Sequence, residues 1–148
     1  MKRYRIGFDF GGLLLFFAIM LPNFIWFAIP APNDVLRRES VTTPLDAVAS
    51  VCQMLMAAAL IAVVNPSGKR LRLTALAGGA AVCGALYYCG WILYYLGKTA
   101  PPVILLLTVP PCLAFLLYAA DRRNLPAIIP GAVFTCCHLA YAAINFLR

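Results

Sequence analysis

The feature that most constrains the fold of this chain is a series of five long apolar stretches separated by short polar segments. Each stretch has about 19–24 residues, and an α-helix of that length crosses a hydrocarbon layer of ~30 Å. Backbone polar groups inside a bilayer must be satisfied within their own segment, so the stretches are expected to be helices. They occupy residues 6–29, 45–64, 73–96, 102–120 and 126–147. The sequence therefore predicts an all-α integral membrane bundle of five transmembrane helices, forming a single domain over residues 1–148.

Composition agrees with a membrane setting. Hydrophobic residues make up 64% of the 148 residues and charged residues 11%, whereas soluble domains have roughly 45–50% and ~25%. One small core cannot bury so many apolar residues, so membrane lipids are the expected surroundings. The net charge of +7 comes from short basic clusters between the apolar stretches. That pattern is typical of membrane topology, and no nucleic-acid partner is expected.

The distribution of lysine and arginine predicts the orientation of the bundle. Threading the five helices puts eight basic residues on the side of the amino terminus and four on the other side. Because basic residues favour the cytoplasmic side, we expect an N-in, C-out topology. The two sets are Lys2, Arg3, Arg5, Lys69, Arg70, Arg72, Arg122 and Arg123, against Arg37, Arg38, Lys98 and Arg148.

The sequence lacks the residues of most catalytic and metal sites. It has one histidine, and no carboxylate is expected deep in the membrane. A zinc site needs three or four ligands, so no metal, no cofactor and no catalytic residue is predicted. A haem held by two histidines of one chain is excluded by count, although pairing of His138 between two subunits, or a single axial ligand, stays open. Six cysteines, all inside the apolar stretches, are interpreted as small packing residues.

Hydrogen-bonding side chains gather in the predicted outer half of the bundle. Phe134, His138, Tyr141 and Asn145 follow at i, i+4, i+7 and i+11, which places them on one face of the last helix. Polar groups in hydrocarbon are costly unless they have partners, so they should face the bundle interior or a wet cavity. The candidate ligand-binding residues are Asn23, Trp26, Gln53, Tyr87, Trp91, Tyr94, His138, Tyr141 and Asn145.

Two interpretations of these residues stay open. Aromatic walls with a few polar tips are typical of a small-ligand pocket. Tyrosine and tryptophan also collect at membrane interfaces without any ligand, and polar side chains can simply join helices. His138 and Gln53 lie deeper than the aromatic residues, so for these two the pocket and the structural interpretation carry equal weight.

Prolines within the helices add to the case for a cavity. Pro22 removes one backbone donor and frees the carbonyl of Ala18, and the resulting kink would turn the Asn23 amide inward. Pro110 and Pro111 do the same near the middle of the fourth helix. Broken helices at mid-depth are tolerated where they line a cavity, although proline kinks are also ordinary in membrane helices.

Four stretches carry a resemblance to known proteins. With LPNFIWFAIPAPN, YYCGWILYYL, the PP pair of the fourth helix and FTCCHLAYAAINF, the chain resembles a family of small multipass bacterial integral membrane proteins, which implies a fold but no activity. Five helices in a chain of this length are also similar in architecture to the tryptophan-rich sensory or translocator proteins, which bind tetrapyrroles and sterols. The tryptophan-rich motifs of that family are absent, since only Trp26 and Trp91 occur.

These observations predict a protein that binds a small molecule or lipid in an outward-facing cavity, and transport of that ligand would extend this function. The alternative is a non-catalytic structural or interaction subunit with no ligand of its own. An enzyme acting on a lipid or quinone ranks last. We expect a bacterial inner, or plasma, membrane as the location, with a homo-oligomer left open.

Overall fold

The computed structural model describes residues 4–66 and 74–147, and in them the chain is almost entirely helical. Each of the five long helices is long and apolar enough to cross a membrane, which confirms the predicted five-helix, all-α membrane bundle. The elements are β1 (Arg5–Ile6), α1 (Phe10–Ala28), the 3-10 turn η1 (Val35–Arg37), α2 (Thr43–Ala62), β2 (Val63–Val64), α3 (Ala75–Tyr95), α4 (Pro101–Asp121) and α5 (Leu125–Phe146).

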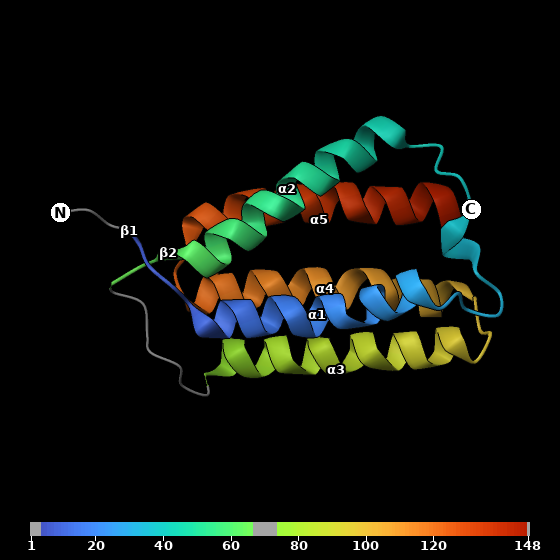
Figure 1. The fold of residues 1–148 in the computed structure, drawn as a ribbon, viewed down its shortest axis with the longest axis horizontal. Coiled ribbons are helices and arrows are strands. Elements are labelled where there is room, and N and C mark those ends of the chain that lie inside the picture. The colour runs from blue at the N-terminus through green and yellow to red at the C-terminus, as the bar shows by residue number, and fades with distance from the viewer. Residues whose placement is uncertain (1–3, 67–73, 148) are drawn as a thin grey trace.

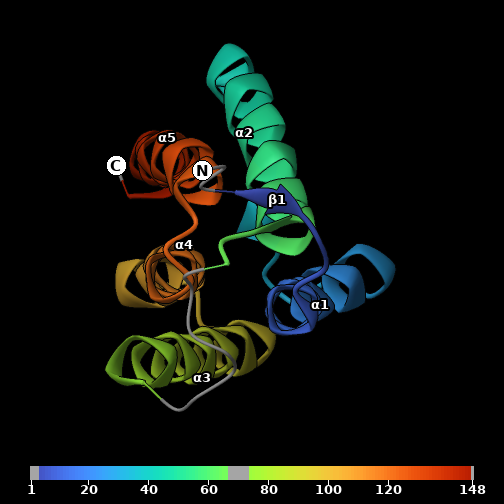
Figure 2. The ribbon, with the colours of Figure 1, turned by 90° about the vertical axis from the view of Figure 1, so that its left-hand side faces the viewer.

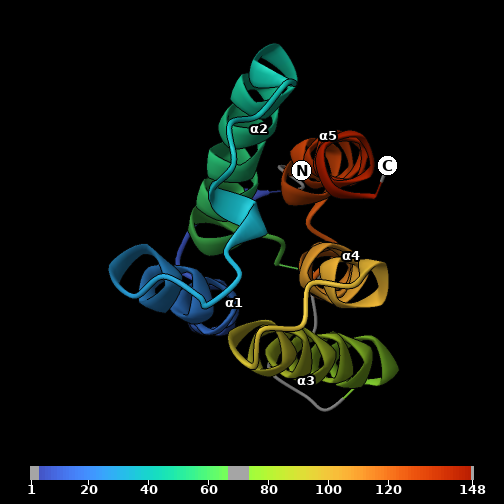
Figure 3. The same cartoon turned by 90° about the vertical axis from the view of Figure 1, so that its right-hand side faces the viewer.

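The helices form two layers, which are clearest when the bundle is viewed from its ends (Figures 2 and 3). Helices α3, α4 and α5 lie in one row, and α1 and α2 lie beside it. Helix α2 is inclined, so that it moves away from α1 toward one end of the bundle (Figure 1). We call that end, which holds residues 29–42, the η1 end; the other end, with β1 and β2, is the amino-terminal end.

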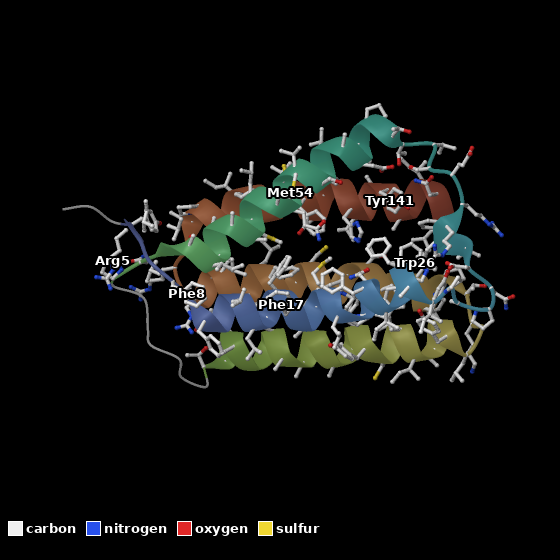
Figure 4. All side chains as sticks on the ribbon, viewed as in Figure 1. Arg5, Phe8, Phe17, Trp26, Met54 and Tyr141 are labelled. Carbon is white, nitrogen blue, oxygen red and sulfur yellow. The ribbon has the colours of Figure 1, made fainter. Side chains whose placement is uncertain are left out.

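Apolar side chains cover the outside of the bundle as well as its core. Phe17 of α1 and Met54 of α2 (Figure 4) are 52% and 65% exposed. Hydrocarbon around the helices would remove this apolar surface from water. The core is centred on α4, where Ile104, Ala114 and Phe115 are almost fully buried.

Glycines set the closest approaches between helices. A Cβ atom added to Gly12 would lie 2.7 Å from the backbone oxygen of Leu60, and one added to Gly90 would lie 2.9 Å from Cβ of Leu106. The first glycine therefore allows α1 to cross the end of α2, and the second allows α3 to pack against α4. Small residues at helix contacts in membranes act in this way.

Two helix ends differ from the predicted boundaries because a short strand pair forms at the amino-terminal end. Arg5–Ile6 pairs antiparallel with Val63–Val64, which shortens the predicted helices 6–29 and 45–64 at that end. Helix α1 begins only after Asp9, whose carboxylate accepts a hydrogen bond from the backbone N–H of Gly12 at 3.1 Å. Asp9 is thus the N-cap of α1, which agrees with the capping or ion-pairing role that its place near the end of the first apolar stretch indicates.

Polar contacts tie the amino-terminal end together. Arg122 forms an ion pair with Asp9 at 3.3 Å, and the hydroxyl of Tyr118 donates a hydrogen bond to Asp9 at 2.9 Å. Of the basic residues counted on the cytoplasmic side, Lys2, Arg3, Lys69, Arg70 and Arg72 lie outside the described residues, as does Arg148 of the opposite set. The N-in orientation stays a prediction.

Candidate functional site

A cavity of ≈ 270 Å³ lies inside the half of the bundle nearer the η1 end. All five long helices and the η1 turn contribute to its wall. Seven of the nine predicted site residues line it: Asn23, Trp26, Gln53, Tyr87, Trp91, His138 and Tyr141. The other lining residues are Ile19, Met20, Phe27, Leu36, Leu107, Thr108, Pro111, Cys112, Phe115, Phe134, Ala142 and Phe146. The labelled side chains of Trp26 and Tyr141 mark the α1 and α5 sides of this region (Figure 4).

Pro22 lies within α1 beside two hydrogen bonds that join this helix to α3. The Ala18 carbonyl, which lacks an N–H partner because residue 22 is proline, accepts a hydrogen bond from the Tyr88 hydroxyl at 2.6 Å. The neighbouring Asn23 amide donates to the Tyr87 hydroxyl at 2.7 Å and to the Ile19 carbonyl at 3.3 Å. The Pro22–Asn23 pair therefore fastens α1 to α3 beside the cavity.

Helix α4 supplies the back wall. Pro110 and Pro111 lie within the helix and are buried, and Pro111 faces the cavity together with Cys112. The hydroxyl of Thr108 donates to the carbonyl of Ile104 at 2.7 Å, so its proton is engaged within the helix. One member of the predicted proline pair, Pro111, thus lies against the cavity, and α4 continues as a single helix through both prolines.

Several polar groups of the wall have no hydrogen-bond partner within the described residues. The imidazole of His138 makes ring contacts only, stacked between Phe134 at 5.1 Å and Tyr141 at 6.1 Å between centroids. The Tyr141 hydroxyl likewise bonds to no described group. The Gln53 amide reaches only the sulfur of Met20 at 3.8 Å, which is a weak acceptor.

Trp91 adds a fourth unsatisfied group. Its side chain is buried, at 6% exposure, and its Nε1–H meets no acceptor at hydrogen-bonding geometry among the described residues. The Tyr87 hydroxyl is near enough to interact with it but not placed for a normal hydrogen bond. Around it the rings of Tyr87, Tyr94 and Tyr95 form an aromatic cluster with centroid distances of 5.7–6.2 Å.

Tyr94 and Asn145 lie outside the cavity wall, although they share helix faces with residues that line it. The Tyr94 hydroxyl donates to Asp34 at 2.9 Å and accepts from the Leu36 N–H at 3.1 Å. The Asn145 side chain accepts from the Val41 N–H at 3.0 Å and donates to the Thr42 hydroxyl at 2.9 Å. Both residues hold the segment between α1 and α2 against the bundle, which is a structural role.

Asp34 is the centre of a network that the sequence did not single out. Its carboxylate accepts hydrogen bonds from Trp26 Nε1 at 2.9 Å, from Tyr94 and from Arg37 Nε at 2.7 Å. The Arg37 guanidinium also donates to the Trp26 carbonyl and lies 4.7 Å from the centre of the Trp26 ring. We call Trp26, Asp34, Arg37 and Tyr94 the Asp34 network. Trp26 lines the cavity, and the other three members lie outside its wall, next to Trp26.

The network also determines the charge state of Asp34. Burial raises the pKa of this carboxyl, but the hydrogen bonds from Trp26, Tyr94 and Arg37 outweigh burial, so its pKa lies below the ordinary value of 3.8. The carboxylate is therefore ionised at neutral pH and paired with Arg37. A signal was available in the sequence, since an Asp followed by Arg at i+3 lies directly after the first helix.

The cavity wall is electrically neutral. No Asp, Glu, Lys or Arg belongs to it among the described residues. Asp46 exerts an electrostatic influence on His138, but its carboxylate accepts from the Thr42 hydroxyl at 3.0 Å. No three His, Cys, Asp or Glu side chains come together as metal ligands in residues 4–66 and 74–147. The wall is thus suited to hydrogen bonding and ring stacking with an uncharged molecule.

Comparisons with family models, with curated proteins and with solved structures gave no match for this chain.

Proposed function

We propose that this chain is a membrane protein that binds a small uncharged molecule or lipid in the cavity between its helices. The observation that carries the proposal is the set of unpaired polar groups in the wall, namely His138, Tyr141 and the buried Nε1–H of Trp91. Cavities that stay empty in proteins are apolar, whereas polar groups held away from water need a partner. A bound molecule with hydrogen-bonding atoms satisfies them.

The dimensions and chemistry of the cavity support the proposal further. Its volume of ≈ 270 Å³ is close to the lower end of the ~300–1,000 Å³ found for small-molecule sites. The two tryptophans of the chain, Trp26 and Trp91, both line it. A ligand with an apolar or aromatic body and one or two hydrogen-bonding groups matches this wall.

The proposed setting is the inner membrane of a bacterium, with the amino terminus in the cytoplasm. The count of basic residues supports it, at eight on one side against four on the other. On that topology the cavity lies in the outer half of the membrane. Release of the ligand on the opposite side would make the protein a transporter, which uptake of the ligand into proteoliposomes tests.

The experiment compares two residues on the same face of α5. The purified protein is heated with and without fractions of a bacterial membrane lipid extract, and the melting temperature is recorded. We expect one fraction to raise the melting temperature of the native chain and of Asn145→Ala, but not of His138→Phe. The apo melting temperature should fall only for Asn145→Ala, because its side chain holds residues 41–42.

A second candidate function is a structural subunit without a ligand. It is favoured by the polar side chains that join elements, such as Asn23 with Tyr87 and Asn145 with Thr42. This candidate gains support if no fraction raises the melting temperature of the native chain, and if the protein purifies in a stoichiometric complex with another membrane protein.

A further inference from the structure

The cavity wall is closed on one side and open on the other. Every lining residue of α3 and α4 is buried, including Tyr87, Trp91 and Thr108. The half-exposed lining residues belong to the other elements. They are Met20, Asn23 and Trp26 of α1, Leu36 of η1, Gln53 of α2, and His138, Tyr141 and Phe146 of α5. The cavity therefore approaches the surface on the side of α1, α2 and α5.

Part of the accessible wall lies on the outer, apolar side of the bundle. Phe27 lines the cavity and is also 63% exposed on the outer side of α1. The η1 end itself is covered by the Asp34 network and by the bonds of Asn145 to residues 41 and 42. A route along the bundle axis would require these hydrogen bonds to break.

Helix α2 borders this side of the cavity through one side chain. It diverges from α1 toward the η1 end (Figures 1 and 3), and Gln53 is the one residue of α2 in the wall within the described part of the chain. The contact that spans α1 and α2 there is the long hydrogen bond from Gln53 Nε2 to Met20 Sδ at 3.8 Å. Thioether sulfur is a weak acceptor, so this contact separates at low cost.

We infer that the ligand is an uncharged amphiphile dissolved in the membrane, and that it enters the cavity sideways between α1 and α2, past Met20, Phe27 and Gln53. This inference rests on the proposed function. It adds a ligand class, because a neutral wall within hydrocarbon selects against ions. It also adds a route, in which the Met20–Gln53 contact is the gate and the Asp34 network is a permanent cover.

The test uses Trp91 as a reporter inside the cavity. In a Trp26→Phe background Trp91 is the sole tryptophan, and its burial at 6% exposure shields it from bulk lipid. Asp34 loses the hydrogen bond from Trp26 in this background but keeps those from Arg37 and Tyr94, so all variants are compared within the same background. Proteoliposomes are mixed rapidly with 8-bromo-1-octanol, an uncharged amphiphile whose bromine quenches indole fluorescence. We expect saturable quenching of Trp91. Quenching that rises linearly with no saturation overturns the proposed function, and with it this inference.

Plugging the gate separates the route from the binding itself. Gln53→Phe adds bulk between α1 and α2 and should slow quenching and its reversal together, by about tenfold. If Gln53→Phe acted only by removing the hydrogen bond of the Gln53 amide, the bromo-alcohol would leave the cavity faster but would not enter it more slowly. The matched control is Met54→Phe, the next residue along α2, which points to the outside at 65% exposure and should change neither rate. Met20→Phe plugs the gate from the α1 side if Gln53→Phe fails to fold.

Asp34→Asn tests the competing route at the η1 end. It weakens the cover formed with Arg37 and Tyr94, and on the sideways route it leaves the quenching rate unchanged. Saturable quenching that is faster in Asp34→Asn and unchanged in Gln53→Phe and Met20→Phe overturns the sideways route while leaving the proposed function intact.

Discussion

The contact between Tyr88 and the Ala18 carbonyl gives the sharpest test of how Pro22 shapes the site. In the native chain this carbonyl has no N–H donor four residues on, because residue 22 is proline, and the Tyr88 hydroxyl at 2.6 Å takes that place. Tyr88→Phe therefore leaves the carbonyl without a donor. An orphaned polar group of this kind costs about 1–3 kcal/mol, so we expect a loss of unfolding free energy in that range.

The same substitution should cost less once the backbone donor is restored. Pro22→Ala gives residue 22 an N–H that can bond the Ala18 carbonyl within α1. Tyr88→Phe then removes only an interhelical hydrogen bond, which averages about 0.6 kcal/mol in membrane proteins. The double-mutant cycle should therefore show a coupling energy of about 1 kcal/mol between residues 22 and 88.

The assay is equilibrium unfolding of the four proteins in mixed detergent micelles, followed by circular dichroism. Tyr95→Phe is the matched control, since the Tyr95 hydroxyl donates to the Ile29 carbonyl at 2.6 Å, beyond the reach of Pro22. It should cost the same with proline or alanine at position 22. Equal costs of Tyr88→Phe in the two backgrounds, within about 0.3 kcal/mol, would refute the role assigned to Pro22.

Three further predictions concern the packing of α3 against α4, the cavity wall and the Asp34 network. Gly90→Ala should lower the unfolding free energy by about 1–3 kcal/mol because the added Cβ would lie 2.9 Å from Cβ of Leu106. Gly84→Ala, whose Cβ would meet no atom within 4 Å, should be neutral or stabilising. Thermal unfolding compares the two variants. Asn23→Ala should lower the unfolding free energy by about 1–3 kcal/mol because it removes the hydrogen-bond donor to the buried Tyr87 hydroxyl. His138→Phe keeps the ring stack and should leave the unfolding free energy of the ligand-free protein unchanged. If His138→Phe lowers it as much as Asn23→Ala does, the assignment of an unpaired imidazole is contradicted. Because the pKa of Asp34 is depressed below 3.8, its contribution to holding residues 29–42 is full above that pH and is lost as the pH falls through the folded-state pKa. The protection of the amides of residues 29–42 against hydrogen exchange, relative to the intrinsic exchange rate at each pH, should therefore fall in acid for the native chain, and Asp34→Asn should remove that pH dependence.

The parts of this structure that local sequence patterns determine were predictable. The five helices follow from apolar length, and the inward turn of Asn23 follows from the proline before it. The shared face of His138 and Tyr141 follows from helical spacing. These inferences need only residues within a turn or two of each other, where backbone geometry leaves few choices.

The parts that depend on contacts between distant segments were not predictable from the sequence. Tyr94 lies on the same face as Tyr87 and Trp91, and Asn145 on the same face as His138 and Tyr141, so periodicity grouped them with the cavity. Periodicity does not indicate where along the helix the cavity ends and the covering segment begins. That boundary depends on Asp34, which lies 60 residues before Tyr94. Likewise, the strand pair that shortens α1 and α2 joins residues 5–6 to 63–64.

The most direct measurement of the central claim is mass spectrometry of small molecules that co-purify with the protein, compared between two neighbouring alanines of α5. Ala142 lines the cavity and is 3% exposed, so Ala142→Leu fills part of the space, while Ala143→Leu adds the same atoms to the exposed face. We predict one uncharged molecule, near one per chain, with the native protein and with Ala143→Leu, and its loss from Ala142→Leu. The same molecule at the same ratio in all three proteins would contradict a ligand site in this cavity.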